Sequence, residues 1–379
     1  MREGWEYKKL VDKCSILYGY PFDSKFFSSS NEDMPLIRIR DVKEGKTSTY
    51  YKGNYPKEYI IHKGDFLIGM DGEFNISAWQ SDDALLNQRV CKIERKNSDV
   101  SMRFIYRFLT KELKRIEDET PYVTVKHLSA KRLNQINLPV PPLPEQERIV
   151  SELDLLSSVI EKKKAQLHEY DQLAQSIFYD MFGDPVTNEK GWEVKKLGDE
   201  FEVSSGGTPS TGRNEFWDNG NISWIGSNMC QNQIIYENDG KYITKEGLEH
   251  SSAKLYHKGF VLVALVGATI GKVALLGFET TTNQNIAGIN VPNNKDYTSL
   301  FIYYLIQSLY YMFENIGEGK FKMANLSFIR SLPIIKPLLT LQQQFASKIE
   351  AIEKQKEQIR QSIAEVETLF NSRMDYYFG

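Results

Sequence analysis

The chain has 379 residues, of which 41% are apolar and 26% are charged. This predicts two or three globular domains and excludes a low-complexity or fibrous protein. The net charge is only −3, but residues 1–144 hold 24 Lys and Arg against 20 Asp and Glu, whereas residues 145–183 hold 4 against 8. The total therefore says little about any one surface, and charge alone does not predict a nucleic-acid partner.

The first 144 residues predict an α+β domain. Residues 35–42 read as a strand. Residues 66–70 and 74–79 are apolar runs on either side of a glycine-containing turn, which indicates a β-hairpin. Residues 102–116 carry apolar side chains at helical spacing, so we expect an amphipathic helix there.

A long helix is predicted to follow, over residues 145–183. From Ile149 to Met181, seam positions recur in alternating steps of four and three residues, the pattern of a coiled coil. A proline-rich stretch at 139–144 precedes the helix, and neither Pro nor Gly occurs inside it. One unbroken helix about 50 Å long is therefore expected.

The remaining residues repeat this plan. Residues 221–226 predict a strand, residues 260–266 and 272–276 predict a hairpin, and residues 300–316 predict a helix. The last stretch, 342–379, aligns without a gap to 146–183, and its own seam runs from Phe345 to Tyr377. Lys163 and Lys356 interrupt the two seams, and such residues snorkel or fix the register.

Short matches in a conserved order show that the two halves are copies of one unit. The matching segments, in chain order, are GWEYKKL (4–10) and GWEVKKL (191–197), HKG (62–64 and 257–259), NQ (87–88 and 283–284) and LS (128–129 and 326–327). Outside these segments the two globular halves are dissimilar.

The chain path predicts how the two helices run. Only residues 184–190 lie between the first helix and the second domain, so that domain is expected at the far end of the helix. The second helix then returns along the first, which gives an antiparallel pair, one domain at each end and a pseudo-twofold axis. The predicted parts are a first domain (1–144), a central spacer helix (145–183), a second domain (184–341) and a C-terminal spacer helix (342–379).

A search for catalytic chemistry finds no convincing motif. Residues 267–273 are one residue short of a phosphate-binding loop, and the five histidines show no metal-ligand spacing. The three cysteines form no Cys-x-x-Cys pair, which excludes a cysteine zinc site and fits a reducing cytoplasm. No Asn/Asp-Pro-Pro-Tyr/Phe element of an amino-methyltransferase occurs. We therefore predict a protein that is not an enzyme and that binds no cofactor or metal of its own.

What remains is a scaffold that carries two loop-rich domains, an arrangement that suits duplex DNA with one reading head on each half-site. Arg and Asn can bond base edges, and Lys suits phosphate. Asp71 and Glu73 suit a cytosine amino group, Asn75 suits adenine, and Phe74 suits either loop support or a thymine methyl. The candidate DNA-binding residues are Arg38, Arg40, Lys43, Asp71, Glu73, Phe74, Asn75, Trp224, Ser227, Asn228, Thr269, Lys272, Lys320 and Lys322.

Apolar residues beside the helix seams predict a further binding surface. Leu155, Val159, Leu173 and Ala351 lie off the seam, where a helix of a partner protein could pack.

At this point the sequence resembles a known family. The segments that carry the resemblance are MFGDPVTNEKGWEVKKLGDEF (181–201), SGGTPST (205–211), PVPPLPEQERIVSEL (139–153) and PLLTLQQQFASKIEAIE (337–353). Over its whole length the chain is similar to the specificity subunit of type I restriction–modification systems. The resemblance implies one target-recognition domain and one long helix in each half, with the two helices acting as a molecular ruler.

The resemblance also implies partners. It predicts double-stranded DNA, two methyltransferase subunits and restriction–translocation subunits, and it assigns S-adenosylmethionine and ATP to those partner subunits. Because the two domains differ in sequence, two different half-sites are expected. Two alternatives stay open: a coiled-coil adapter that reads no DNA, and a self-contained methyltransferase–nuclease, which would need the missing Asn/Asp-Pro-Pro-Tyr/Phe element.

Overall fold

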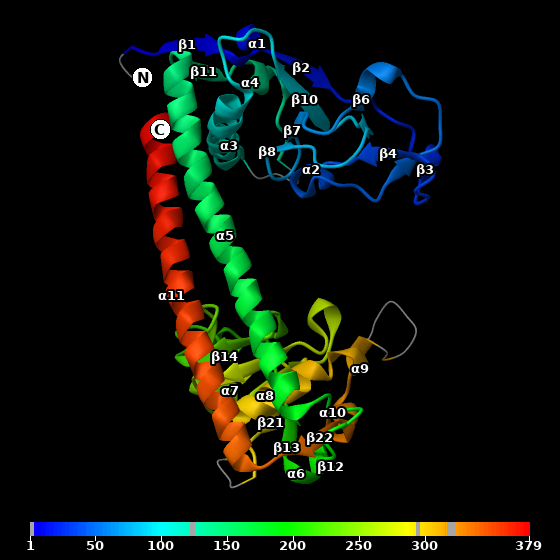
Figure 1. Cartoon of the computed structure of the whole chain (residues 1–379), viewed down its shortest axis with the longest axis vertical. Coiled ribbons are helices and arrows are strands. Elements are labelled where there is room, and N and C mark those ends of the chain that lie inside the picture. Colours follow the sequence, from blue (N-terminus) through cyan, green and yellow to red (C-terminus); the bar gives the residue numbers. More distant parts are fainter. Residues whose placement is uncertain (1–3, 122–125, 293–295, 315, 317–322) are drawn as a thin grey trace. The chain divides into compact units, whose positions relative to one another are not determined.

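The computed structural model describes residues 4–121, 126–292, 296–314, 316 and 323–379. The chain divides into two compact units (Figure 1). Unit 1 comprises residues 1–163 and 362–379, and unit 2 comprises residues 164–361. Each unit therefore contains a globular part and a portion of each of the two long helices.

Unit 1 is an α+β structure, and the residues described in it form three sheets. Its strands are β1 (Glu6–Lys9), β2 (Cys14–Tyr18), β3 (Phe27–Ser28), β4 (Met34–Ile37), β5 (Tyr50–Tyr51), β6 (Ile60–Ile61), β7 (Phe66–Gly69), β8 (Asn75–Ala78), β9 (Ala84–Leu86), β10 (Val90–Arg95) and β11 (Asn137–Val140). Its short helices are α1 (Leu10–Lys13), η1 (Ser24–Phe26), α2 (Asp41–Glu44), η2 (Lys57–Tyr59) and α4 (Ala130–Asn134). The sheet orders are β2-β10-β7-β8, β3-β5-β4-β9-β6 and β1-β11.

The helix α3 (Met102–Glu119) gives unit 1 its main core. Phe104, Phe108 and Ile116 share the face of α3 that is buried, because helical positions three and four apart lie on one side. This face packs with Ile68 and Ile93 of the β2-β10-β7-β8 sheet in one apolar cluster. The hairpin predicted around residues 66–79 is confirmed, since β7 and β8 pair antiparallel.

Unit 2 has the same plan. Its strands are β12 (Glu193–Lys196), β13 (Glu202–Ser205), β14 (Ile222–Ile225), β15 (Gln233–Ile235), β16 (Tyr242–Ile243), β17 (Leu255–Tyr256), β18 (Val261–Ala264), β19 (Val273–Leu276), β20 (Thr280–Thr282), β21 (Ile286–Asn290) and β22 (Pro333–Lys336). Its short helices are α6 (Leu197–Glu200), η3 (Asn214–Phe216), η4 (Ser227–Met229), α7 (Lys245–Glu249), η5 (Gly267–Thr269), α8 (Ser299–Ser308), α9 (Tyr310–Glu314) and α10 (Leu326–Ser331). The sheet orders are β13-β21-β18-β19-β15, β16-β14-β20-β17 and β12-β22.

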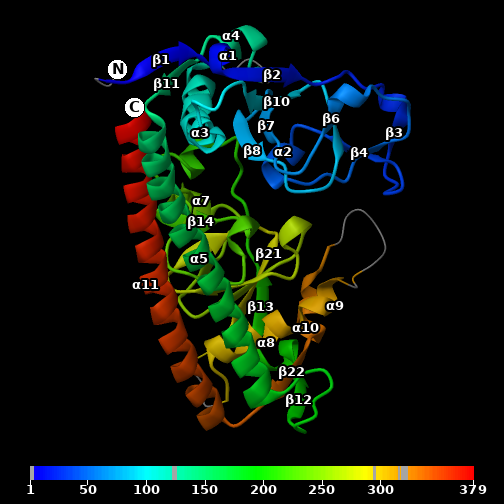
Figure 2. The ribbon, with the colours of Figure 1, turned by 45° about the horizontal axis from the view of Figure 1, so that its top comes forward.

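The central hairpin of unit 2 is more deeply buried than that of unit 1. Every residue of β18 and β19 is buried, which matches the continuous apolar runs in the sequence. Figure 2 shows β13 and β21, which pair antiparallel in the same sheet. In place of the single helix predicted over 300–316, the structure has two helices, α8, which ends at Ser308, and α9.

The structure corrects one match of the internal repeat. Ser129 caps α4 by accepting the N–H of Arg132, and Asn325 caps α10 by accepting the N–H of Phe328. Ser129 therefore corresponds to Asn325 and not to Ser327, so the shared offset is 196 residues here as well. The structure also forms two antiparallel pairings that the sequence patterns do not predict, β1-β11 and β12-β22, and the second strand of each pair contains a proline. Proline fits these strands because each pair is a two-stranded edge.

Two 40-residue helices, α5 (Leu143–Phe182) and α11 (Leu339–Phe378), carry the predicted seams. All of the predicted seam positions are buried or half-buried. In unit 1, Glu152 near the start of α5 accepts hydrogen bonds from Tyr377 Oη at 2.6 Å and Arg373 Nε at 2.7 Å near the end of α11. In unit 2, the ring of Phe345 near the start of α11 lies 5.3 Å from that of Phe182 at the end of α5. The helices are antiparallel in each unit (Figure 1).

A fully buried glutamine fastens the start of each long helix to its unit. Gln146 Nε2 donates to the carbonyl of Pro141 at 2.8 Å, and Gln146 Oε1 accepts the N–H of Ser101, the N-cap of α3, at 2.8 Å. Gln342 makes the same pair of bonds in unit 2, to Pro337 at 3.0 Å and from Thr298, the N-cap of α8, at 2.9 Å. A buried amide must find such partners, so these bonds set where each helix begins.

Candidate nucleic-acid interface

The structure brings together the two groups of candidate residues of unit 1, those at 38–43 and those at 71–75. Lys43, in α2, forms an ion pair with Glu73, in the β7–β8 turn, at 3.0 Å between Nζ and Oε1. In the same turn, Asp71 forms an ion pair with Arg89 of the β9–β10 loop at 3.2 Å. Three loops far apart in the sequence therefore form one polar surface. Arg40 is also exposed beside α2.

A cavity of about 340 Å³ opens on this surface. Its lining residues are Phe22, Ser24, Phe27, Arg38, Ile39, Asn87, Gln88, Arg89 and Val90. The backbone N–H of Arg38 donates to the buried carboxylate of Asp41 at 2.7 Å, which fixes the turn after β4. Strand β4 ends at Ile37, so Arg38 lies in a turn and not in a strand that reaches residue 42. Its guanidinium has no ion-pair or hydrogen-bond partner among the described residues and is exposed.

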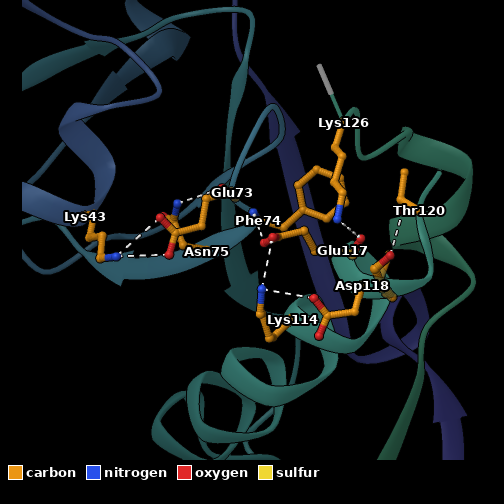
Figure 3. A network of polar contacts seen from close by, with 10 residues as sticks. Lys43, Glu73, Phe74, Asn75, Lys114, Glu117, Asp118, Thr120 and Lys126 are labelled. Carbon is orange, nitrogen blue, oxygen red and sulfur yellow. Dashed lines mark hydrogen bonds and ion pairs between the residues drawn. The ribbon is translucent and has the colours of Figure 1, made fainter. Parts of the chain in front are cut away.

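A buried carboxylate holds the β7–β8 turn against α3 (Figure 3). Glu117 accepts the backbone N–H of Phe74 at 3.0 Å through Oε2 and the ammonium of Lys114 at 3.1 Å through Oε1. The turn is also pinned from the other side, since the N–H of Gly72 donates to the carbonyl of Lys126 at 2.8 Å. Gly72 has a φ of +70°, a conformation that a side chain disfavours. The turn is therefore a rigid support.

Two residues of this turn correct the sequence prediction. Phe74 is 3% exposed and packs in the core of unit 1, so its predicted contact with a thymine methyl is wrong, and loop support stays as the other predicted role. Asn75 donates from Nδ2 to the carbonyl of Glu73 at 2.9 Å, and its Oδ1 is buried. The predicted bidentate contact of Asn75 with adenine is therefore wrong, because that contact needs both ends of the amide to be accessible.

Unit 2 places its candidates in equivalent loops. Lys272, at the end of the β18–β19 turn, donates to Gln231 Oε1 at 2.7 Å, which links this turn to the segment after η4. In unit 1, the pair of Glu73 and Lys43 links the β7–β8 turn to α2 in the same way. Asn228 is exposed in η4, and Ser227 beside it is half-buried. Thr269 is half-buried and donates to the carbonyl of Val266 at 3.5 Å.

One candidate of unit 2 is a core residue. Trp224 is 8% exposed, and its indole N–H already donates to the carbonyl of Gly207 at 3.2 Å. Its ring packs edge-on against Trp217 at 5.4 Å between centroids. The predicted contact of Trp224 with DNA is therefore wrong. Lys320 and Lys322 lie outside the described residues.

Sequence reasoning missed the residues of the β9–β10 loop and its equivalent in unit 2. Gln88 and Arg89 are exposed at the cavity of unit 1, and Gln284 is exposed in the β20–β21 loop. Gln284 Oε1 accepts the hydroxyl of Thr208 at 2.6 Å. The signal was present, since Asn-Gln is one of the few segments that the two otherwise dissimilar domains share.

The candidate partner-binding residues lie on the outside of the long helices. Leu155 of α5 is 66% exposed in unit 1, and Val159, one turn further on, is half-buried. In unit 2, Leu173 is 46% exposed and Ala351 is exposed. An exposed leucine on a helix that already has a buried seam indicates a second contact face.

The cysteines and the metal-ligating residue types show no catalytic arrangement in the described part of the chain. Burial raises the pKa of the Cys14, Cys91 and Cys230 thiols to about 12, so they stay protonated and are poor nucleophiles. The described residues include no cluster of three or more His, Cys, Asp or Glu suited to a metal ion. Within those residues, no helix combines the length and the apolar character that a membrane crossing needs.

Comparison with known proteins identifies the family. The type I restriction modification DNA specificity domain matches the chain twice, over residues 2–169 and 189–368. The chain therefore belongs to this family, and the sequence prediction of the family is confirmed. The description of this family names DNA specificity, which does not support the adapter alternative.

Individual relatives agree. The chain is 42% identical over 173 residues to the EcoBI specificity subunit of Escherichia coli, a match that covers 46% of this chain and 36% of that subunit. The chain thus spans about a third of that relative's length. It is 25% identical over 334 residues to the MjaIX specificity subunit of Methanocaldococcus jannaschii, covering 80% of this chain and 76% of that one. Both relatives are named as specificity subunits and not as methyltransferases or nucleases.

Solved structures confirm the fold class. The specificity subunit of the type I restriction–modification system of M. genitalium matches with a TM-score of 0.51 at 13% identity, over 98% of this chain and 95% of that one. A chain from a structure on complex assembly and conformational transition of the type I system matches with a TM-score of 0.56 at 16% identity, over 100% and 98%. At these identities the likeness concerns the fold alone.

The buried bond from Phe74 to Glu117 is expected to stabilise unit 1. Glu117→Ala leaves the Phe74 N–H without an acceptor, which should lower the free energy of unfolding by about 1–3 kcal/mol. Asp118→Ala is the matched control, because Asp118 also pairs with Lys114, at 3.0 Å, but is exposed. It should change the stability by less than about 0.5 kcal/mol. Urea unfolding measures both variants, and equal losses would show that the ion pairs of Lys114 matter and the buried bond does not.

Proposed function

We propose that this chain is the DNA-recognition subunit of a type I restriction–modification complex and reads a bipartite, asymmetric site. Residues 1–144 and 184–341 are the two target-recognition domains, each reading one half-site. Residues 145–183 and 342–379 are the spacer helices. The observation that carries this proposal is the double family match, over 2–169 and 189–368, to two units of one plan whose exposed loops differ.

The cavity of unit 1 supports a specific reading mode. Arg38 and Arg89 line it together, and an arginine can bond guanine through O6 and N7 at once. The ion pair with Asp71 orients Arg89, so we assign Asp71 a supporting role. Glu73 similarly orients Lys43, which suits a DNA phosphate together with Arg40. Unit 1 thus reads guanine within its half-site.

The surface of unit 2 has different chemistry. Asn228 of η4 is exposed and suits an adenine edge, while Ser227 and Thr269 offer hydroxyl groups. Lys272 is held by Gln231 and suits phosphate. Because the guanidinium pair of unit 1 has no counterpart among these residues, the second half-site differs from the first.

Partner subunits supply the chemistry. The exposed leucines on the long helices support two docking sites, each for an amphipathic helix of a methyltransferase subunit. The first site is at Leu155 and Val159, and the second is at Leu173 and Ala351. S-adenosylmethionine binds to those subunits, and restriction subunits that use ATP complete the complex. We place the protein in the cytoplasm, since its DNA substrate lies there and its three cysteines are free.

The sequence motif that the complex methylates in cells tests this function. In Arg38→Ala with Arg89→Ala, one or two guanine positions of a single half-site should relax, because each lost contact costs about 1–3 kcal/mol of discrimination. The other half-site and the spacer should stay unchanged. Methylome sequencing measures the motif, and Lys63→Ala, which removes an exposed lysine outside the cavity, should leave it intact. An unchanged motif, or equal loss at both half-sites, would contradict the proposal.

Glutamate substitutions on the outer face of α5 test whether the methyltransferase docks there. Leu155→Glu with Val159→Glu should release a methyltransferase subunit in size-exclusion chromatography, because a carboxylate cannot be buried without a partner. Ser158→Glu adds a single carboxylate at an exposed polar position and should leave the complex intact. If the double variant stays fully assembled, the methyltransferase docks elsewhere.

A further inference from the structure

The β9–β10 loop of unit 1 and the β20–β21 loop of unit 2 are held by the same backbone contacts. The N–H of Gly19 donates to the carbonyl of Val90 at 3.0 Å, and the N–H of Gly206 donates to that of Ile286 at 3.3 Å. A Cβ atom on Gly19 would lie 2.0 Å from the carbonyl oxygen of Asn87, and one on Gly206 would meet a side-chain oxygen at 2.1 Å. Both loops therefore pack directly on a glycine backbone.

The strands before the two loops are placed alike as well. The N–H of Tyr20 donates to the carbonyl of Leu86 at 2.9 Å, and the N–H of Gly207 donates to that of Thr282 at 2.8 Å. Strand β9 pairs parallel with β4, and β20 pairs parallel with β14. The two loops are thus the same structural feature, built once in each unit.

Both loops carry Asn-Gln, and in both the asparagine side chain accepts a backbone N–H of its own loop. Asn87 Oδ1 accepts the N–H of Gln88 at 2.9 Å, and Asn283 Oδ1 accepts the N–H of Asn285 at 3.1 Å. The asparagine therefore shapes the loop. The glutamine that follows it, Gln88 or Gln284, is exposed in both units.

The residues around the two glutamines differ. Arg89 follows Gln88, whereas Asn285 follows Gln284. Directly after the neighbouring parallel strand, unit 1 has Arg38 and unit 2 has Gly226. The glutamine is thus shared, while the residues suited to base reading beside it are not.

We propose that Gln88 and Gln284 each donate a hydrogen bond from Nε2 to a phosphate of the DNA backbone and so set the position of each unit on the duplex. The inference rests on the proposed function, in which the two units read half-sites of different sequence. Bases differ between such half-sites, but phosphates recur in both. A side chain that both units present on the same loop therefore matches the backbone, and glutamine is one of the residues that contact phosphate.

The contacts of Gln284 favour phosphate over a base edge. Its Oε1 already accepts the hydroxyl of Thr208, which leaves the amide nitrogen as the outward donor. Bidentate reading of adenine uses both the oxygen and the nitrogen of the amide, whereas a phosphate oxygen needs only a donor.

Alanine variants in the complete complex with its methyltransferase partner test this assignment. Gln88→Ala and Gln284→Ala should each weaken binding of a duplex that carries the methylated motif by about 3- to 10-fold, the loss of one hydrogen bond. The methylated motif in cells should keep every position of both half-sites. Arg89→Ala and Asn228→Ala, at residues assigned to base edges, are the controls and should relax base positions instead. Relaxation of a base position by Gln88→Ala, or unchanged affinity in both glutamine variants, would overturn the inference.

Replacement of single DNA phosphates by uncharged methylphosphonates tests which phosphate each glutamine contacts. Each duplex carries one methylphosphonate, and the affinity of the complex for it is measured. In each half-site, one such replacement should weaken binding of the wild-type complex but not of the Gln88→Ala or Gln284→Ala complex. Sensitivity that persists at every phosphate in both variants would overturn the assignment. A wild-type complex that does not prefer the motif duplex over a scrambled one would overturn the proposed function, and the inference with it.

Discussion

The packing of α5 against α11 is the constraint on which both units depend. The end of α5 enters the core of unit 2, where Phe178 and Phe182 contact Phe345. The end of α11 enters the core of unit 1, where Met374 and Tyr377 are buried. Unit 1 therefore completes its core with a segment that is distant in the sequence, whereas unit 2 is one continuous segment that includes the end of α5. The loops that we assign to DNA therefore rest on cores to which the long helices contribute.

Buried polar groups then fix the register of these helices. Gln146 and Gln342 are fully buried and bond the N-caps of α3 and α8. In unit 2, Lys356 is 7% exposed within the seam and pairs with Asp171 of α5 at 2.7 Å. A slip of the helices would remove this interhelical partner and leave Lys356 only its pair with Glu353 of the same helix, at 2.6 Å, so the pairing opposes other registers even where it adds little stability. The sequence had left open whether Lys356 snorkels or fixes register, and this pairing favours the second role.

Periodicity explains why the helices and hairpins could be predicted and the reading surface could not. A heptad seam and an apolar hairpin are local patterns, and the residues from Ile149 to Met181 carry the first without a break. Whether a loop side chain faces DNA depends on distant contacts. Phe74 and Asn75 turn inward because the turn rests on α3, and Trp224 is covered by Trp217. The cavity residues Gln88 and Arg89 come together with Arg38 only through the parallel pairing of β4 and β9.

The central claim is that both units contact DNA through the same pair of loops. Hydrogen–deuterium exchange of the complex with its methyltransferase partner, with and without a duplex that carries its motif, measures this directly. The account predicts slower exchange in residues 87–89 and 283–285 together when the duplex is present. Protection confined to one of the two loops, or found only in α5 and α11, would contradict it.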